Sequence, residues 1–209
     1  MKYLSLIILF MLLSCGNKED ILLPKSNVTI VSNVKDHSPI YIFFRTRGKD
    51  TLAEVNRKNS IISTNWILNI DKRLPLRLVI PEVMKLQDKK RTEVAHKNES
   101  AANYYSYADS VGKNLAFLPF TKVYYKMGKP LNGGFIFYFK KESDLVLVDT
   151  IKIKKSEVLN YLYSFTFAIN PKILLLFDKN MSFEEYLQIK IQIRELDTFN
   201  KDVPKEFIY

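Results

Sequence analysis

The chain has 209 residues, of which 47% are apolar and 13% aromatic, and its formal net charge is +10. This apolar content is enough to bury a core, which excludes a wholly disordered chain. Only seven of the 32 basic residues are arginine and no aromatic–basic recognition motif is present, so we expect no nucleic-acid partner. The lysines predict a solvated surface or, as the alternative, attraction to anionic envelope material such as lipid head groups.

The N-terminus has the features of a secretory signal. Lys2 gives a positive start, and the apolar run Leu6–Leu13 is shorter than the about 20 residues that span a bilayer. The run closes with Leu12-Leu13-Ser14-Cys15, which resembles the bacterial lipobox. In that family a peptidase cuts before a cysteine whose thiol carries diacylglycerol. The resemblance implies that residues 1–14 are a signal peptide and that Cys15 is the lipid attachment site.

The lipobox also implies a location. Its acyl chains, palmitate among them, would anchor the protein in the outer membrane, since each buried methylene contributes about 0.8 kcal/mol. Residues 16–20 are similar to the acidic tag of some surface-exposed Bacteroidota lipoproteins and equally to a solvated tether, so the periplasmic and cell-surface faces both stay open. The alternatives are an uncleaved N-terminal anchor and an ordinary signal with an incidental cysteine. Because Cys15 is the only cysteine, no disulfide is expected.

The next part of the chain predicts strands. Residues 15–38 are expected to be an acylated tether, and residues 39–83 an N-terminal β-rich lobe. The stretch PIYIFFRTRGKDTLAEVNR predicts a hairpin with a turn at Gly48-Lys49-Asp50, and NSIISTNWILNI predicts a further strand. Because Pro75 and Pro81 bracket LPLRLVIP, the sequence favours an edge strand there over a helix.

Residues 84–114 are strongly polar and contain no proline. Few apolar positions recur at helical spacing, so we expect a polar linker or a solvated helix between two lobes. The cluster Tyr104-Tyr105-Ser106-Tyr107 lies in this segment. Such tyrosines would suit a carbohydrate or protein interface, or would pack on the neighbouring lobe.

Residues 115–209 predict a C-terminal α+β lobe. The runs KVYYKM, GFIFYFKK and DLVLVD predict a three-stranded meander, and KILLLFD a buried strand. Ser156 is expected to cap a helix that ends at Asn170-Pro171. The predicted fold class is therefore α+β, with short antiparallel or mixed sheets packed by one or two helices and a C-terminal ββαβα-like lobe.

Residues 186–193 give two conflicting signals. Ser182 and Glu185 form a capping-box pattern, with Met181 and Tyr186 at the hydrophobic-staple positions, which predicts a helix start. Most of the following residues alternate between apolar and polar, which is strand periodicity. The capping pattern leads us to favour a helix.

The predicted order of elements over residues 135–197 resembles the periplasmic domain of ExbD/TolR-type biopolymer-transport proteins. A hairpin leads into D-x-I and a helix opening at Ser156-Glu157, and Asp178-Lys179 match the Asp-Lys pair that ends a strand before a capped helix. Upstream, LPLRLVIPEVMKL is similar to the stretch with which these proteins leave the membrane, ending at Ile80-Pro81. The chain lacks that family's transmembrane helix with its proton-carrying aspartate. The resemblance therefore implies a partner-binding domain, for a TonB-like linker or the cell wall, without proton coupling.

No catalytic, metal or cofactor site is predicted. His37 and His96 lie far apart in polar surroundings, and Glu184-Glu185 suit the dipole at a helix start. No phosphate loop or nucleophile elbow occurs. We therefore expect a non-enzymatic, lipid-anchored envelope protein that binds another protein. The alternative is a surface-exposed glycan- or nutrient-binding lipoprotein, and an enzyme is the third reading.

Overall fold

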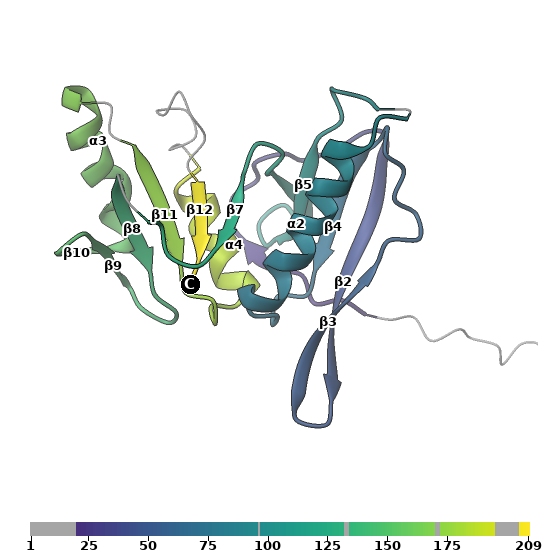
Figure 1. Ribbon diagram of the computed structural model, residues 1–209, viewed down its shortest axis with the longest axis horizontal. Helices are drawn as coiled ribbons and strands as arrows, with labels where there is room; N and C mark the ends of the chain where they lie inside the picture. Colours follow the sequence, from purple (N-terminus) through teal and green to yellow (C-terminus); the bar gives the residue numbers. More distant parts are fainter. Residues whose placement is uncertain (1–19, 96, 132–133, 170–171, 195–204) are drawn as a thin grey trace, which may run out of the picture.

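The computed structural model describes residues 20–95, 97–131, 134–169, 172–194 and 205–209. The fold class is α+β, as the sequence predicts, and it contains two six-stranded mixed sheets. The sheets lie side by side in the molecule (Figure 1). The first is built by the N-terminal half of the chain and the second by the C-terminal half.

The first sheet has three parallel strands at its centre. Strands β2, β4 and β5 are parallel, while β3 and β6 pair antiparallel with β2 and β5. Helix α2 (Leu76–Thr92) connects β4 to β5 and packs its apolar side into the core. The strands are β1 (Lys25–Ser26), β2 (His37–Arg47), β3 (Asp50–Asn56), β4 (Asn65–Ile70), β5 (Asn103–Asp109) and β6 (Asn114–Pro119).

The second sheet has four parallel strands, β8, β11, β12 and β7, flanked by the antiparallel strands β9 and β10. Helices α3 (Val158–Ile169) and α4 (Phe183–Gln192) lie on the same face, where Phe137 contacts Tyr161 and Phe177 contacts Tyr186. A short 3-10 turn, η1 (Lys155–Glu157), precedes α3. The strands are β7 (Tyr125–Met127), β8 (Phe135–Phe139), β9 (Leu145–Val148), β10 (Ile151–Lys154), β11 (Ile173–Phe177) and β12 (Lys205–Ile208).

The two halves repeat one unit: a hairpin, a strand parallel to the first hairpin strand, a turn, a helix and another parallel strand. Asp71 directly follows β4 in the first half, and Asp178 directly follows β11 in the second half. Their backbone N–H groups donate at 3.0 Å to the carbonyls of Ile42 and Phe139, the corresponding positions of β2 and β8. Each carboxylate accepts a hydrogen bond from the N–H two residues further on, at 3.1 Å and 2.9 Å. The second half differs by inserting β10 and α3.

The two turns meet at a seam of reciprocal hydrogen bonds. Leu76 N–H donates to the carbonyl of Met181 at 2.9 Å, and Phe183 N–H donates to the carbonyl of Leu74 at 2.8 Å. The donors occupy corresponding positions in the two halves, and so do the acceptors. Such reciprocity is the mark of an isologous twofold contact, found here within one chain. The bonds also satisfy N–H groups of the first helical turns, which have no partner inside a helix.

Helix α4 confirms the preferred prediction for residues 186–193. Ser182 caps it, since its side chain accepts from the Glu185 N–H at 3.2 Å. The Glu185 carboxylate does not complete the capping box, because it accepts instead from the Glu142 N–H and from Lys155. The strand-like alternation has a packing cause: the helix buries side chains around most of its circumference, including Lys190.

The edge strand predicted at 74–81 is wrong. Pro75 is the N-cap of α2, and Pro81 lies inside that helix. Proline costs an interior helix one backbone hydrogen bond. The full burial of Val79, Ile80 and Val83 against the sheet offsets this cost.

Of the two forms expected over 84–114, the linker is wrong, and the helix is present only to Thr92, with one side buried. The interval contains the second half of α2 and the whole of β5. Polar side chains misled the prediction, because Gln87 and Lys90 are buried on the helix and make hydrogen bonds there. The chain passes from the first sheet to the second after β6, at residues 120–124.

The expected tether over 15–38 is folded from residue 20 onward. Pro24 accepts from the Ala108 N–H at 2.8 Å, and Val31 exchanges two backbone hydrogen bonds with Phe117. Val34 is buried against the first sheet. This segment therefore belongs to the first half of the fold.

Two predictions within residues 115–209 need correction. Strand β7 pairs in parallel with β12 and not with β8, so the meander consists of β8, β9 and β10. Ser156 lies inside the 3-10 turn, whose N-cap is Lys154, and so it does not cap α3. The buried strand at 173–177 is confirmed as β11. The expected helix end at Asn170-Pro171 lies outside the described residues.

Candidate functional site

The residues predicted from the sequence do not gather at one place. Cys15 and His96 lie outside the described residues. His37 is exposed at the start of β2, where its Nδ1 lies 2.7 Å from the carbonyl oxygen of Val34. Among the described residues, no group of three His, Cys, Asp or Glu side chains could hold a metal ion.

Glu184 and Glu185 start α4 and form separate ion pairs. Glu184 lies 3.3 Å from Lys72 of the first half, and Glu185 lies 2.8 Å from Lys155. The two carboxylates therefore hold different elements together, and they do not converge on a shared reaction site.

The tyrosine cluster of β5 lies mostly inside the protein. Tyr105 and Tyr107 are fully buried, and Ser106 between them is buried as well. The Tyr107 hydroxyl donates to the carbonyl of Val28 at 2.9 Å. Of the two roles considered for this cluster, the structure shows packing, which includes an edge contact of Tyr105 with Phe183 of the second half.

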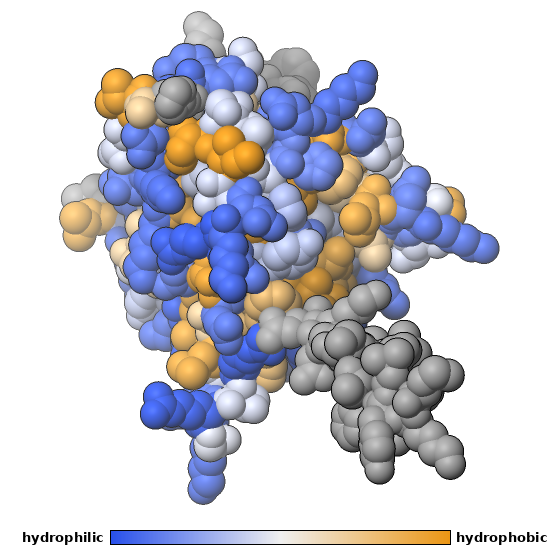
Figure 2. Space-filling model, turned by 90° about the vertical axis from the view of Figure 1, so that its right-hand side faces the viewer, coloured by the Kyte–Doolittle hydropathy of each residue, from blue (hydrophilic) through white to orange (hydrophobic). Residues whose placement is uncertain are grey.

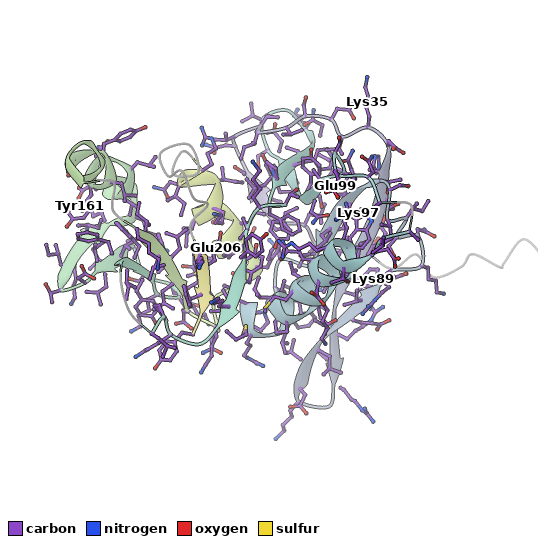
Figure 3. The ribbon with its side chains drawn as sticks, turned by 45° about the horizontal axis from the view of Figure 1, so that its top comes forward. Lys35, Lys89, Lys97, Glu99, Tyr161 and Glu206 are labelled. Atoms are coloured by element: carbon purple, nitrogen blue, oxygen red, sulfur yellow. The ribbon has the colours of Figure 1, made fainter. Side chains whose placement is uncertain are left out.

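A buried network of hydrogen-bonded side chains joins the two sheets. The hydroxyls of Tyr105 and Tyr125 lie 2.8 Å apart, and those of Tyr125 and Tyr186 lie 3.0 Å apart. Tyr186 donates to Glu206 at 2.7 Å, and Lys190 lies 2.7 Å from the other oxygen of that carboxylate. Glu206 lies near the middle of the molecule (Figure 3).

This hydrogen-bond network has a structural role. Burial raises the pKa of all three tyrosine hydroxyls well above the ordinary value, and the nearby Glu206 carboxylate adds to the shift. The hydroxyls therefore stay protonated and pass hydrogen bonds from the first sheet to the second. Nothing in the sequence around Glu206 marks it as a buried group, and its partner Lys190 is assigned only once α4 is placed.

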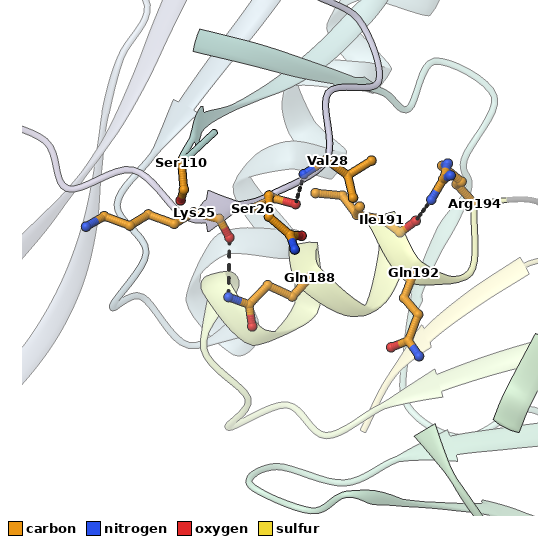
Figure 4. Close-up of a pocket in the computed structure, with 9 residues that line it drawn as sticks. Lys25, Ser26, Val28, Ser110, Gln188, Ile191, Gln192 and Arg194 are labelled. Atoms are coloured by element: carbon orange, nitrogen blue, oxygen red, sulfur yellow. Dashed lines mark hydrogen bonds between the residues drawn. The ribbon is translucent and has the colours of Figure 1, made fainter. Parts of the chain in front are cut away.

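One hollow, of about 560 Å³, lies where the N-terminal segment meets α4 (Figure 4). Gln188 donates to the carbonyl of Lys25 at 3.3 Å, and Arg194 donates to the carbonyl of Ile191 at 2.8 Å. The Gln188 bond thus joins the two halves, whereas the Arg194 bond is local to the end of α4, and we assign no ligand to this hollow.

The β2–β3 hairpin extends beyond its sheet as an arm, defined here as residues 43–54. Strand β2 pairs with β4 only as far as Ile42, whereas its pairing with β3 continues to Arg47–Asp50. Figure 1 shows the arm projecting below the sheet. Figure 2 looks onto this side of the molecule and shows hydrophobic patches broken up by hydrophilic side chains.

Contacts stiffen the arm and fix its base. Arg45 crosses to Glu54 at 2.8 Å and lies 5.0 Å above the Phe43 ring. At the base, Arg73 lies 4.3 Å above the ring of Phe44. Strand β3 is the outer strand of the sheet, and no described strand pairs with the edge of residues 50–54 that faces away from β2. This outer edge of the arm can therefore accept an additional strand.

A second candidate surface lies on the second sheet, on the face opposite α3 and α4. After β7 the chain crosses this face as a strap, defined here as residues 128–131, which lies beside Leu174 of β11 and Phe207 of β12. Just before β8 the backbone lies close to that preceding β11, because a Cβ at Gly134 would lie 2.6 Å from the carbonyl oxygen of Lys172. The apolar side chains of this face are Ile136, Tyr138, Leu174, Leu176 and Phe207.

Two hollows adjoin the strap and share Lys129 and Pro130. The lysine hollow, about 320 Å³, is lined by Lys126, Met127, Lys129, Pro130, Leu131, Lys172, Leu174, Lys205 and Phe207. The apolar hollow, about 440 Å³, is lined by Lys129, Pro130, Ile136, Tyr138, Leu147, Asp149, Leu176 and Tyr209. Sequence reasoning missed both, because it paired β7 with β8 and so left no strap.

No family model, curated protein or solved structure matches this chain. Within the described parts of the chain, no helix is long and apolar enough to cross a membrane. Function is therefore inferred from the residues and their geometry.

Proposed function

We propose that this chain is a non-enzymatic, lipid-anchored protein of the cell envelope that holds a partner protein by strand addition to its arm. The observation that carries the proposal is the outer edge of the arm, residues 50–54 of β3, with which no described strand pairs. An exposed strand edge is a template for an incoming strand, whose backbone hydrogen bonds supply the affinity.

The ExbD/TolR resemblance supports this class of function. It is carried by the order of elements over residues 135–197, which includes the strand–turn–helix unit around Asp178-Lys179. The first half repeats that unit around Asp71-Lys72. Ile80-Pro81, first likened to a membrane exit, belongs to the helix of the first unit. What the resemblance implies is contact with a partner, without chemistry.

The lipobox supports the anchor. Only four residues, 16–19, separate Cys15 from the start of the described fold at Asp20, and the five steps between them span at most about 18 Å. Acylation of Cys15 would therefore hold the first half close to the membrane surface. In a Cys15→Ala variant we expect the precursor to stay uncleaved and unacylated, as followed by palmitate labelling. Cleavage at an ordinary signal site without acylation would contradict the anchor.

The glycan-binding alternative rested partly on the tyrosine cluster of β5. Since Tyr105 and Tyr107 lie in the core, these side chains offer no exposed aromatic platform. We propose no glycan site.

Shortening the arm tests the proposal. Replacing residues 44–53 by Asn-Gly closes the hairpin after the Phe43–Glu54 pair, which has the same hydrogen-bonding parity as the native closing pair Arg47–Asp50, and keeps every pairing of β2 with β4. The tagged full chain, cross-linked in cells and purified, should lose its partner while keeping its melting temperature within a few degrees. As a control, Val111→Arg alters an exposed turn near the opposite edge of the sheet. If the parent protein, the shortened variant and Val111→Arg co-purified with the same proteins, the arm would not be the binding site.

A further inference from the structure

The two hollows beside the strap differ in chemistry. Among the described residues, four lysines and no carboxylate line the lysine hollow, whereas mainly aliphatic and aromatic side chains line the apolar hollow. Leu147 and Tyr209 of the apolar hollow are 37% and 43% exposed, so apolar surface there is open to a ligand. Because the hollows share Lys129 and Pro130, one ligand can occupy both.

Among the described residues, no carboxylate forms an ion pair with Lys126, Lys172 or Lys205. Lys129 contacts an aromatic ring, with its Nζ 4.3 Å from the ring centre of Tyr209. Neighbouring like charges repel one another, and an anion held among them relieves that repulsion. Lysine ammonium groups are effective point charges for a phosphate.

We propose that the two hollows together bind a single-chain lipid with a phosphate head group. The phosphate lies in the lysine hollow and the acyl chain lies in the apolar hollow, with Lys129 and Pro130 between them. Both volumes fall in the range of small-molecule sites, about 300–1,000 Å³. A phosphate suits four lysines better than a carboxylate does, since it carries more negative charge at neutral pH. This site is separate from the arm.

The test uses water-soluble probes and calorimetric titration. The protein is the mature chain, residues 15–209, carrying Cys15→Ser so that no acyl chain of its own competes. Decyl phosphate, below its micelle concentration, should bind saturably, and at least tenfold more tightly than decanoate, decyl maltoside or inorganic phosphate. Octyl phosphate should bind about tenfold more weakly than decyl phosphate, because two methylenes leave the apolar hollow.

Charge reversal locates the head group. The double variant Lys172→Glu/Lys205→Glu should weaken decyl phosphate binding at least tenfold. The control Lys49→Glu/Lys58→Glu makes the same change in net charge at exposed positions of the first half, and should bind within twofold of the parent. Circular dichroism melts check that both variants are folded. In the apolar hollow, Leu147→Ser should weaken the ten-carbon probe more than the eight-carbon one.

Three results would overturn the proposal. Equal losses in the two double variants would mean that only overall charge matters. Affinity independent of chain length would remove the acyl chain from the apolar hollow. Binding of hexaglutamate without binding of decyl phosphate would assign the lysines to an acidic protein segment. None of these results bears on the arm, which the shortened hairpin tests separately.

Discussion

The two halves share a turn and a helix seam, yet they expose different surfaces. Ile67 and Leu174 each lie four residues before the aspartate of their turn. In the first half Val31 and Val34 pack with Ile67 and close that face of the sheet. In the second half Leu174 lines a hollow beside the strap.

The hairpins also differ, and here the first half has the more exposed element. In the second half β8 pairs with β11 along its whole length, from Phe135 to Phe139. In the first half β2 continues past its partner strand and forms the arm. The repeated unit thus serves as a scaffold, and the candidate binding surfaces lie where the two copies depart from each other.

The helices sharpen this comparison, because each buries one lysine. Lys190 of α4 is paired with Glu206, whereas Lys90 of α2 donates to neutral oxygens, among them that of Asn103 at 3.0 Å. Lys190→Met should lower the free energy of unfolding by about 3–5 kcal/mol, because it leaves a buried carboxylate without its cation. Urea unfolding measures this loss.

The matched control for Lys190→Met is the double variant Lys190→Met/Glu206→Gln. It buries no charge and keeps an acceptor for the Tyr186 hydroxyl, so it should recover at least half of the loss. If the single and double variants were equally unstable, the ion pair would not be the cause.

Lys90 should give a smaller effect that depends on pH. Burial lowers its pKa from 10.5 to about 8. Between pH 8 and 10.5 the unfolded chain binds more protons at this site, so the free energy of unfolding should rise with pH, by roughly 1–3 kcal/mol across the window. Below pH 8 the full cost of burying the charge is present. Lys90→Met should remove this rise in urea unfolding series at pH 7.5, 8.5 and 9.5; parallel profiles for the two proteins would count against it.

The smallest predicted effect is the difference in stability loss between substitutions of the two turn aspartates, Asp71 and Asp178. Burial alone would raise the pKa of Asp71, but hydrogen bonds and charge from Arg73 outweigh it and hold the pKa below its ordinary value. Asp178 has no arginine in that position. Asp71→Asn should therefore cost about 1–2 kcal/mol at pH 7, and Asp178→Asn about half of that.

The pH dependence separates charge from shape at Asp71. Because its folded pKa is depressed, its contribution is present above the unfolded pKa of about 3.8 and is lost as the pH falls through the folded pKa. The difference in free energy of unfolding between wild type and Asp71→Asn should therefore become smaller as the pH falls into the acid range. A difference that stays constant with pH would mean that the substitution acts only through the geometry of the turn.

Local signals predicted part of this fold. The β2–β3 hairpin, β4, β11 and the start of α4 follow from alternation, turn residues and a capping serine. The sequence does not predict helix α2, because Pro81 removes a helical hydrogen bond and only burial against the sheet offsets that cost. Strand β5 was missed because its tyrosines look polar until their hydroxyls find partners.

The candidate surfaces depend on long-range pairing. The sequence predicts the hairpin of the arm, but its projection depends on where β4 stops pairing with β2. The strap exists because β7 pairs with β12, some 80 residues later in the chain, and no local pattern announces that pairing. Lys126, Lys172 and Lys205 come together only through it.

The most direct test compares the two hairpins inside the cell. Leu52 on β3 and Leu145 on β9 are both 44% exposed, and each lies on the second strand of its hairpin. A photo-cross-linking amino acid is placed at one position or the other in the full chain. The arm predicts a discrete protein adduct from position 52 and none from position 145. Equal adducts from both positions, or an adduct from position 145 alone, would contradict the assignment of partner binding to the arm.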